Sequence, residues 1–326
     1  MKVLIRTSLK KFIITLNKKS LKYLKYVPVS PYKKFYLYAP LSLFIVIAFA
    51  YCKPASKTQA VPEQQNALLW QITGNGLTKP SYLYGTIHMI CPEDFSMSDT
   101  LKASFAKSEK IYLELDMDDP AMTMKTLQLA IMKDKSLSDL MSKEEYPRLD
   151  KFMKDSIGMP LMVFNKMKPF TLMSVLYTKV LPCMKPDSYE QSFMSMAQQQ
   201  KKEVLGLEKL EDQFAVFDKI PDSAEVQMIL QMINDFDGQR KEFAKMIEAY
   251  KKKDLDALSK MISASPDIAG FEDLLLVNRN KNWIPVMEKA MNAQRTFFAV
   301  GAGHLPGNDG VITLLKKAGY TVVPVD

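Results

Sequence analysis

Beyond residue 67, short runs of apolar residues, either continuous or alternating with polar ones, lie mainly toward the two ends of the chain, with one run in the middle. These runs are residues 68–73, 81–87, 111–116, 203–207, 296–300 and 320–325. Their length and their content of aliphatic and aromatic residues predict β-strands. Glycine, asparagine and proline separate the first two runs, which predicts a β-hairpin.

The middle of the chain has a different period. From residue 119 to residue 292, apart from the strand at 203–207, apolar residues recur every three or four positions, as in amphipathic helices. Shorter helices are predicted at residues 98–108 and 311–318, and the second lies between two strands as in a βαβ unit. Because the two strand-forming ends must meet, the helical middle is an insertion. The pattern therefore predicts a mixed α/β domain with a large helical insertion.

Charge divides the chain into two unequal parts. Residues 1–35 hold ten basic residues and no acidic residue, whereas the whole chain has a net charge of +8. The part after residue 35 is therefore slightly acidic, and the basic character belongs to an N-terminal arm. This distribution removes the support that a basic protein would give to nucleic-acid binding, so we expect no nucleic-acid partner.

An uncharged, mostly apolar segment follows the arm at residues 36–52. Its length falls between a signal-peptide core of about 7–15 residues and a spanning helix of about 20. Because basic residues flank only its N-terminal side, we expect the arm inside and the rest outside. The expected order is a signal peptide or transmembrane anchor, a linker at residues 53–66 and a membrane-anchored, extracytoplasmic domain at residues 67–326. Cys52 resembles the lipid-modified cysteine of bacterial lipoproteins, so a lipid anchor is an alternative, although Tyr51 departs from the small residues of a lipobox.

Two further cysteines, Cys91 and Cys183, lie in the exported part. In an oxidising compartment, two cysteines far apart in sequence often form a disulfide, which we expect here. Two unpaired buried thiols are the alternative.

The chain has only two histidines, His88 and His304, and both end a Gly-x-x-His frame that follows a predicted strand. Ligands bind at the carboxyl ends of strands in α/β sheets, and imidazole is a metal ligand and a proton carrier near neutral pH. One histidine at a strand end is more often a hydrogen-bonded structural residue. The repeated frame favours one shared reaction centre instead.

A catalytic metal centre commonly takes three protein ligands, so a carboxylate is expected beside the histidines. Glu114 is the best candidate, because it interrupts an apolar strand, and Glu208 follows the strand at 203–207. Arg279 and Asn280 lie on a predicted helix and fit the binding of a carboxylate or an oxyanion. A surface salt bridge for Arg279 and a helix-terminal charge for Glu208 are the ordinary alternatives. Serine and cysteine nucleophile motifs and a complete nucleotide-binding loop are absent.

These motifs resemble the TraB/GumN family, which includes the pheromone-shutdown proteins and the Tiki metalloproteases. The residues that carry the resemblance are Tyr84-Gly-Thr-Ile-His88, Leu113-Glu-Leu115, Gly206-Leu-Glu208, Asn278-Arg-Asn280, Val300-Gly-Ala-Gly-His-Leu-Pro-Gly307 and Asp309-Gly310. The resemblance implies a fold similar to the erythromycin-esterase and haem-binding ChaN proteins, a mixed sheet flanked by helices. It spans about residues 68–326.

The resemblance also implies an activity. Tiki-like members are metal-dependent proteases, which implies that His88, His304 and Glu114 hold a divalent metal ion, with Arg279 nearby. We therefore hypothesise a metal-dependent hydrolase acting on a peptide or protein, with Glu114 or Glu208 as ligand or general base. The alternative is a non-catalytic protein of the same fold that binds a peptide or haem through the same histidines, because a fold alone does not choose a function.

Overall fold

The computed structural model describes residues 66–265 and 268–325. The basic arm, the apolar segment with Cys52 and nearly all of the expected linker lie outside these residues. Within the described ranges, no helix has both the length and the apolar character needed to cross a membrane.

In the described part of the chain, six strands form one mixed sheet, in the order β4-β3-β5-β2-β1-β6. The strands are β1 (Leu69–Gly74), β2 (Ser81–Thr86), β3 (Lys110–Leu113), β4 (Val204–Gly206), β5 (Thr296–Gly301) and β6 (Tyr320–Pro324). Strand β1 is antiparallel to both of its neighbours, β2 and β6, whereas β2, β5, β3 and β4 are mutually parallel. The mixed α/β class with a mixed sheet is therefore confirmed.

The strand-forming ends meet as expected, but not in the simplest way. Strands β5 and β6 run in the same direction with a helix between them, yet the β1–β2 hairpin lies between the two in the sheet. The connection from β5 to β6 therefore crosses over the hairpin. It places the last strand, β6, beside the first strand, β1, at one edge of the sheet. The run at residues 111–116 is also shorter than predicted, because β3 ends at Leu113 and leaves Glu114 just past it.

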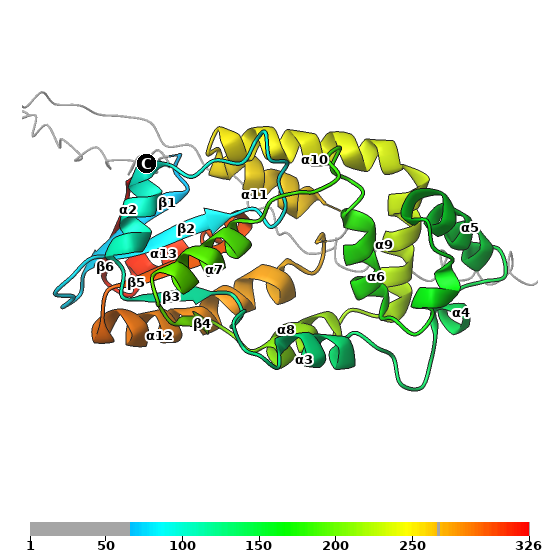
Figure 1. Cartoon of the computed structure of the whole chain (residues 1–326), viewed down its shortest axis with the longest axis horizontal. Helices are drawn as coiled ribbons and strands as arrows, with labels where there is room; N and C mark the ends of the chain where they lie inside the picture. Colours follow the sequence, from blue (N-terminus) through cyan, green and yellow to red (C-terminus); the bar gives the residue numbers. More distant parts are fainter. Residues whose placement is uncertain (1–65, 266–267, 326) are drawn as a thin grey trace, which may run out of the picture. The chain divides into compact units, whose positions relative to one another are not determined.

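Helices cover both faces of the sheet and form a separate group beyond it (Figure 1). The α-helices are α2 (Asp99–Lys107), α3 (Met122–Leu129), α4 (Leu137–Leu140), α5 (Glu145–Phe152), α6 (Pro169–Tyr177), α7 (Tyr189–Gln199), α8 (Leu210–Phe217), α9 (Asp222–Asn234), α10 (Phe236–Lys251), α11 (Leu255–Ala264), α12 (Asn278–Ala293) and α13 (Val311–Lys317). Short η segments are η2 (Met153–Ile157), η3 (Leu161–Phe164), η4 (Asp273–Val277) and η5 (Ala302–His304). Successive residues of β5 point to opposite faces of the sheet. Phe297 contacts Phe105 of α2 and Phe193 of α7 on one face, while Phe298 packs beside Tyr112 of β3 on the other.

Two apolar cores hold the domain together. The first packs the sheet against the helices around it and includes Trp283, Phe297 and Leu83. The second lies within the insertion and joins α5, α6 and α9 around residues such as Leu172 and Ile229. In Figure 1, α4, α5, α6 and α9 stand beyond the edge of the sheet, and α10 runs from that group back over the strands. The insertion thus has a core of its own.

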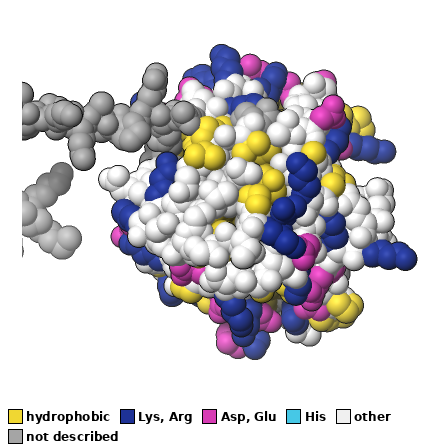
Figure 2. Space-filling model, turned by 90° about the vertical axis from the view of Figure 1, so that its left-hand side faces the viewer, with side chains coloured by type: hydrophobic (Ala, Val, Ile, Leu, Met, Phe, Trp, Pro, Cys, Tyr) yellow, Lys and Arg dark blue, Asp and Glu magenta, His cyan; other side chains and the backbone are white. Residues whose placement is uncertain are grey.

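On the face shown in Figure 2, basic and acidic side chains are interspersed.

Cys91 and Cys183 form a disulfide with their Cα atoms 5.8 Å apart, which confirms the predicted pairing. The bond closes a long loop, since the two cysteines are 92 residues apart. Beside it, Ile90 and Asp187 exchange two backbone hydrogen bonds of 3.0 and 2.8 Å. The segment before α7 is therefore fixed against the segment after β2.

Replacing both cysteines, as Cys91→Ser with Cys183→Ser, should lower the free energy of unfolding by about 2–4 kcal/mol, because a crosslink over so long a loop restricts the unfolded chain. Urea denaturation monitored by tryptophan fluorescence measures the change. Wild-type protein unfolded in the presence of a reductant is the control and should match the double variant. Equal stability with and without the bond would contradict this account.

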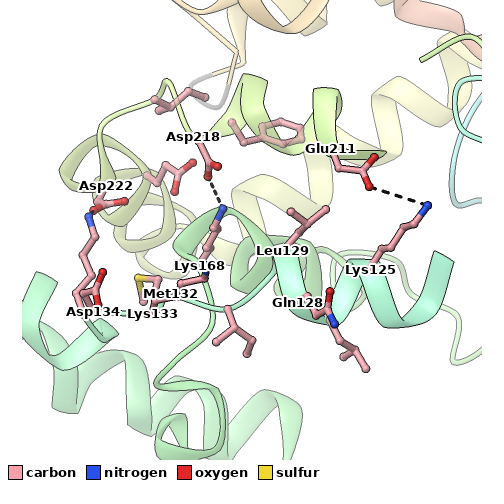
Figure 3. Close-up of a pocket in the computed structure, with 16 residues that line it drawn as sticks. Lys125, Gln128, Leu129, Met132, Lys133, Asp134, Lys168, Glu211, Asp218 and Asp222 are labelled. Carbon is pink, nitrogen blue, oxygen red and sulfur yellow. Dashed lines mark hydrogen bonds and ion pairs between the residues drawn. The ribbon is translucent and has the colours of Figure 1, made fainter. Parts of the chain in front are cut away.

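A cavity of about 1100 Å³ lies within the insertion between α3, the loop after it and α8–α9 (Figure 3). Its wall carries paired charges, among them Lys168 with Asp218 at 2.5 Å. Glu225, only 4% exposed, also lines this cavity and accepts a hydrogen bond from the amide of Phe170. Burial raises the pKa of Glu225 to about 7, and the charges of Asp222 and Asp218 add to this effect.

The raised pKa of Glu225 predicts a pH-dependent stability. The folded protein keeps the proton up to about pH 7, whereas an unfolded glutamate releases it near 4.5, so the free energy of unfolding should fall as pH rises between these values. Glu225→Gln should remove about 1–3 kcal/mol of this fall. Urea denaturation from pH 5 to pH 8 tests it, with Glu211→Gln, an exposed carboxylate of the same cavity, as the control. A wild-type fall that persists in Glu225→Gln would reject the assignment.

Candidate functional site

Four parallel strands end at the same edge of the sheet, and each is followed within three residues by a candidate side chain. His88 follows β2, Glu114 follows β3, Glu208 follows β4 and His304 follows β5. Because parallel strands share an orientation, the four positions meet at one edge although they are far apart in sequence. Arg279 and Asn280 reach the same edge from the first turn of α12.

Three of these side chains converge on Gly301. A Cβ atom added to Gly301 would lie 3.4 Å from Oε1 of Glu114, 3.6 Å from Cδ2 of His304 and 3.8 Å from Nε2 of His88. The Gly301 amide donates to Oε1 of Glu114 at 2.8 Å. These are ordinary van der Waals distances, so the first glycine of the second Gly-x-x-His frame marks the point that the three side chains surround. The expected approach of His88, Glu114 and His304 is therefore present.

Arg279 is the centre of a buried polar network. Its side chain is 9% exposed, and its Nη2 atom donates to Oε2 of Glu114 and to Oε1 of Glu208, both at 2.6 Å. Its Nη1 atom lies 3.3 Å from Nε2 of His304 and donates to the Leu275 carbonyl. The guanidinium thus joins the ends of β3 and β4 to α12 and also contacts a histidine of the centre.

Glu208 lies beside Arg279 rather than at Gly301. Both of its oxygens accept from Nε of Arg279, at 3.0 and 3.1 Å. Gln213 and the indole of Trp283 also donate to Glu208, each at 3.1 Å. Glu208 is therefore placed to orient Arg279, whereas Glu114 has an oxygen directed at Gly301.

Asn280 fixes the tautomer of His304. The Asn280 side-chain amide donates to the Asp309 carbonyl at 2.9 Å, so its oxygen must face Nδ1 of His304, 2.6 Å away. Nδ1 therefore carries the proton and donates, and Nε2 presents its lone pair toward Arg279 and Glu114. Nε2 of His304 is 3.9 Å from Oε1 of Glu114.

His88 is held by Glu190, a residue that sequence reasoning missed. Nδ1 of His88 donates to Oε1 of Glu190 at 3.0 Å, and the hydroxyls of Thr86 and Ser188 donate to the same carboxylate. Glu190 lies in the first turn of α7, which follows the segment fixed by the disulfide to Cys91. The expected disulfide was the available signal, because it placed the acids after Cys183 close to His88.

Burial and mutual charge set the protonation of the centre. Burial alone would raise the pKa of Glu114, but the positive charges of Arg279 and His88 and the hydrogen bond from the Gly301 amide outweigh it and lower that pKa to about 2; a proton on His304 adds to this effect in acid. Burial lowers the pKa of His304 to about 3, against the attraction of Glu114. For His88, loss of water contacts in the cleft and the charge of Arg279 lower the pKa. The hydrogen bond to Glu190 and the charge of that carboxylate outweigh both and raise it to about 9. At neutral pH the centre therefore holds a carboxylate, a neutral imidazole and an imidazolium.

A second cavity, of about 600 Å³, opens directly on this centre. Its lining includes His88, Arg279, Gly301 and His304 together with apolar side chains of the insertion. The larger cavity contains none of the candidate residues. The side chain of His88 is 68% exposed because it projects into this space, whereas that of His304 is 7% exposed. The centre is thus accessible from one side.

The donor set fits a divalent transition metal in kind. Two imidazoles and a carboxylate are typical ligands, and each imidazole has its other nitrogen held by a partner, as metal-binding histidines do. Within the described residues, however, no three His, Cys, Asp or Glu side chains are close enough together to hold an ion. Arg279 also occupies Oε2 of Glu114 and contacts His304. The three donors are thus of a suitable kind but are not arranged around one ion in the described structure.

A sequence model of the TraB/PrgY/gumN family matches residues 68–324, which is most of the chain. The chain belongs to the TraB/PrgY/gumN family. The match covers all six strands and every candidate residue. Both Gly-x-x-His frames, Glu114 and Arg279 are therefore parts of a TraB/PrgY/gumN domain.

The relatives of this TraB/PrgY/gumN domain include two proteins described as metalloproteases. Metalloprotease TIKI1 of Danio rerio is 23% identical over 322 residues, covering 82% of this chain and 64% of the relative. Metalloprotease TIKI2 of Xenopus tropicalis is 23% identical over 318 residues, covering 80% of this chain and 60% of the relative. The chain thus spans less than two thirds of either relative. No solved structure matches it significantly, so the expected likeness to erythromycin-esterase and ChaN folds stays a prediction.

Removing the central cation of this TraB/PrgY/gumN site should be costly. Arg279→Met leaves Glu114 and Glu208 buried without their cation, so the free energy of unfolding at pH 7 should fall by about 3–5 kcal/mol. The pKa of Glu114 should then rise, and the loss should shrink as pH falls toward 5, because protonation removes the unpaired charge. Urea denaturation at both pH values measures this.

Lys281→Met is the matched control on the same helix. Its ion pair with Asp309 is 52% and 43% exposed, so this variant should lose less than about 1 kcal/mol. Equal effects of the two substitutions would contradict a special role for Arg279.

Proposed function

We propose that the domain is a metal-dependent hydrolase that cleaves peptide bonds at the sheet edge between His88 and His304. The observation that carries the proposal is the convergence of two imidazoles and the Glu114 carboxylate on Gly301, beside an accessible cavity. The relatives described as metalloproteases support it. In this proposal His88, His304 and Glu114 would hold the ion, which would polarise the scissile carbonyl as a Lewis acid and lower the pKa of the attacking water.

The residues around these ligands have separate tasks. Glu190 and Asn280 hold the Nδ1 atoms of His88 and His304, which directs both Nε2 atoms to the reaction centre. Binding of a cation there requires His88 to lose its extra proton, because only a neutral imidazole has a lone pair to donate. Metal affinity should therefore fall with falling pH.

Arg279 and Glu114 act on the substrate side. The Arg279 guanidinium is held rigidly by Glu208 and lines the cavity, so it can stabilise negative charge on the oxygen of an attacked carbonyl without reorganising. Glu114 is ionised at neutral pH and suits the binding of a cation, because its lowered pKa makes it a weak proton acceptor. Glu208 serves as a positioning residue, since its oxygens are taken by Arg279, Gln213 and Trp283.

We also propose that the domain works outside the cytoplasmic membrane, tethered by residues 36–52. The Cys91–Cys183 disulfide supports this placement, because structural disulfides persist in oxidising compartments. The basic arm would remain inside by the charge asymmetry of its flanks.

The alternative function is binding without turnover, of a peptide or of haem. One observation favours it: Arg279 and the Gly301 amide already satisfy the two Glu114 oxygens, and the three candidate ligands do not close around one ion in the described structure. Haem binding through His88 would give a Soret absorption band that His88→Ala removes.

Metal content and peptide cleavage, measured on the same purified full-length protein, decide between the two functions. The wild type should bind about one divalent ion per chain and cleave members of a peptide library. His304→Ala should lose the ion and at least about 100-fold of kcat/KM, because it removes a ligand. Glu190→Gln should lose about 10–100-fold in metal affinity as an orienting residue.

Lys317→Ala, an exposed residue on α13, is the control and should keep both metal and cleavage. Circular dichroism checks that each variant is folded. Full cleavage by a metal-free protein or by His304→Ala would reject the metal-dependent mechanism. Peptide binding without cleavage by any metal form would favour the non-catalytic alternative.

A further inference from the structure

The cavity beside the candidate centre has an apolar wall built by the helical insertion. Its side chains come from α6, α10, α11 and η4, and include Met173, Phe243, Met246, Met261, Ile262 and Leu275. Phe243, Met246, Met261 and Ile262 are half-buried, so each keeps surface for contact with a ligand. Apart from the candidate residues, the charged residue of the lining is Glu242, and its carboxylate pairs with Lys245 at 2.6 Å. The wall therefore favours apolar groups.

This wall touches the loop that carries the centre. A Cβ atom added to Gly303 would lie 2.5 Å from Cδ1 of Ile262, so α11 packs directly against the second Gly-x-x-His frame. The cationic side chains of the lining, Arg279 and His88, belong to the candidate centre, so a group packed against the wall meets apolar side chains rather than a cation. A group that enters the cavity thus has apolar contacts immediately beside the atoms proposed to react.

We propose that the cavity is a specificity pocket for a bulky apolar side chain of a peptide, flanking the bond presented to His88 and His304. This inference rests on the proposed function and adds its substrate class. The volume of about 600 Å³ lies within the roughly 300–1,000 Å³ of ordinary ligand pockets and can admit a large side chain with part of its main chain. Leucine, methionine and phenylalanine are preferred in this position, and aspartate and glutamate are excluded.

Polar groups in the wall favour a peptide over a plain hydrocarbon chain. Gln239 and Ser265 line the same cavity. Burying such groups against a hydrocarbon without hydrogen bonds is unfavourable, whereas a peptide main chain offers donors and acceptors to them.

Two measurements test the pocket separately from the chemistry. Binding of fluorescent peptides that differ at one position (Leu, Phe, Ala or Asp) is measured on the full chain carrying His304→Ala, and cleavage of the same peptides is measured on the full chain with intact histidines. Leu and Phe peptides should bind and react at least about tenfold better than the Ala peptide, and the Asp peptide should do worse still. Met246→Trp, which narrows the cavity, should reduce the preference for Phe over Ala about tenfold while the Ala peptide is still accepted.

Lys260→Trp is the matched control, because it adds the same side chain at an exposed position of α11 outside the lining. It should leave the preference unchanged. Apolar preference in binding with no cleavage would uphold the pocket and reject the hydrolase. Cleavage with no preference among the four peptides, or a preference that Met246→Trp does not alter, would reject the pocket. Displacement of the peptides by a fatty acid at equal affinity would also overturn it, because the occupant would then be an acyl chain.

Discussion

The Arg279 guanidinium lies buried between Glu114 and Glu208, and the geometry of the candidate centre depends on this arrangement. A lone buried cation or carboxylate would be strongly unfavourable, but each of these charges is compensated by the others and by directed hydrogen bonds. The network also has a structural consequence. It joins the ends of β3 and β4 to the start of α12, and α12 in turn supplies the Asn280 amide that orients His304. The position of one histidine therefore follows from an ion pair formed by other residues.

The second histidine depends on a different constraint, a covalent one. Cys91 lies three residues after His88, and its disulfide partner lies shortly before the helix that carries Glu190. The crosslink and the paired backbone of Ile90 and Asp187 hold these two segments together, so the Glu190 carboxylate stays within hydrogen-bond reach of His88. The two histidines are thus fixed independently, His304 by the polar network and His88 by the crosslinked segment. His88 keeps more freedom because its ring projects into the cavity.

The local pattern of apolar residues predicted the strands and helices well, but it predicted little of how the strands pair with one another. All six strands follow apolar runs, because burial of a strand selects such residues within a few positions. The insertion of the β1–β2 hairpin between β5 and β6 depends on contacts between distant segments, which local periodicity does not record. The shared site of His88, Glu114 and His304 was predictable because the ends of parallel strands meet at one edge. Glu190 was missed because it reaches that edge only through the disulfide, and the close contact of Glu208 with Arg279 depends on where α12 crosses the sheet.

The polar centre and the apolar wall of the cavity are physically linked. Charges interact more strongly where water is excluded, so the fixed guanidinium of Arg279 gains effect on a neighbouring carbonyl from the side chains of α10 and α11 that enclose it. The same enclosure would be unfavourable for an uncompensated charge, which explains why both Glu114 oxygens have partners. In the proposed reaction, a substrate with an apolar group beside its reacting bond would complete the exclusion of water when it binds, whereas a charged group would bring water in with it. Substrate selection and electrostatic activation would then be two effects of one wall.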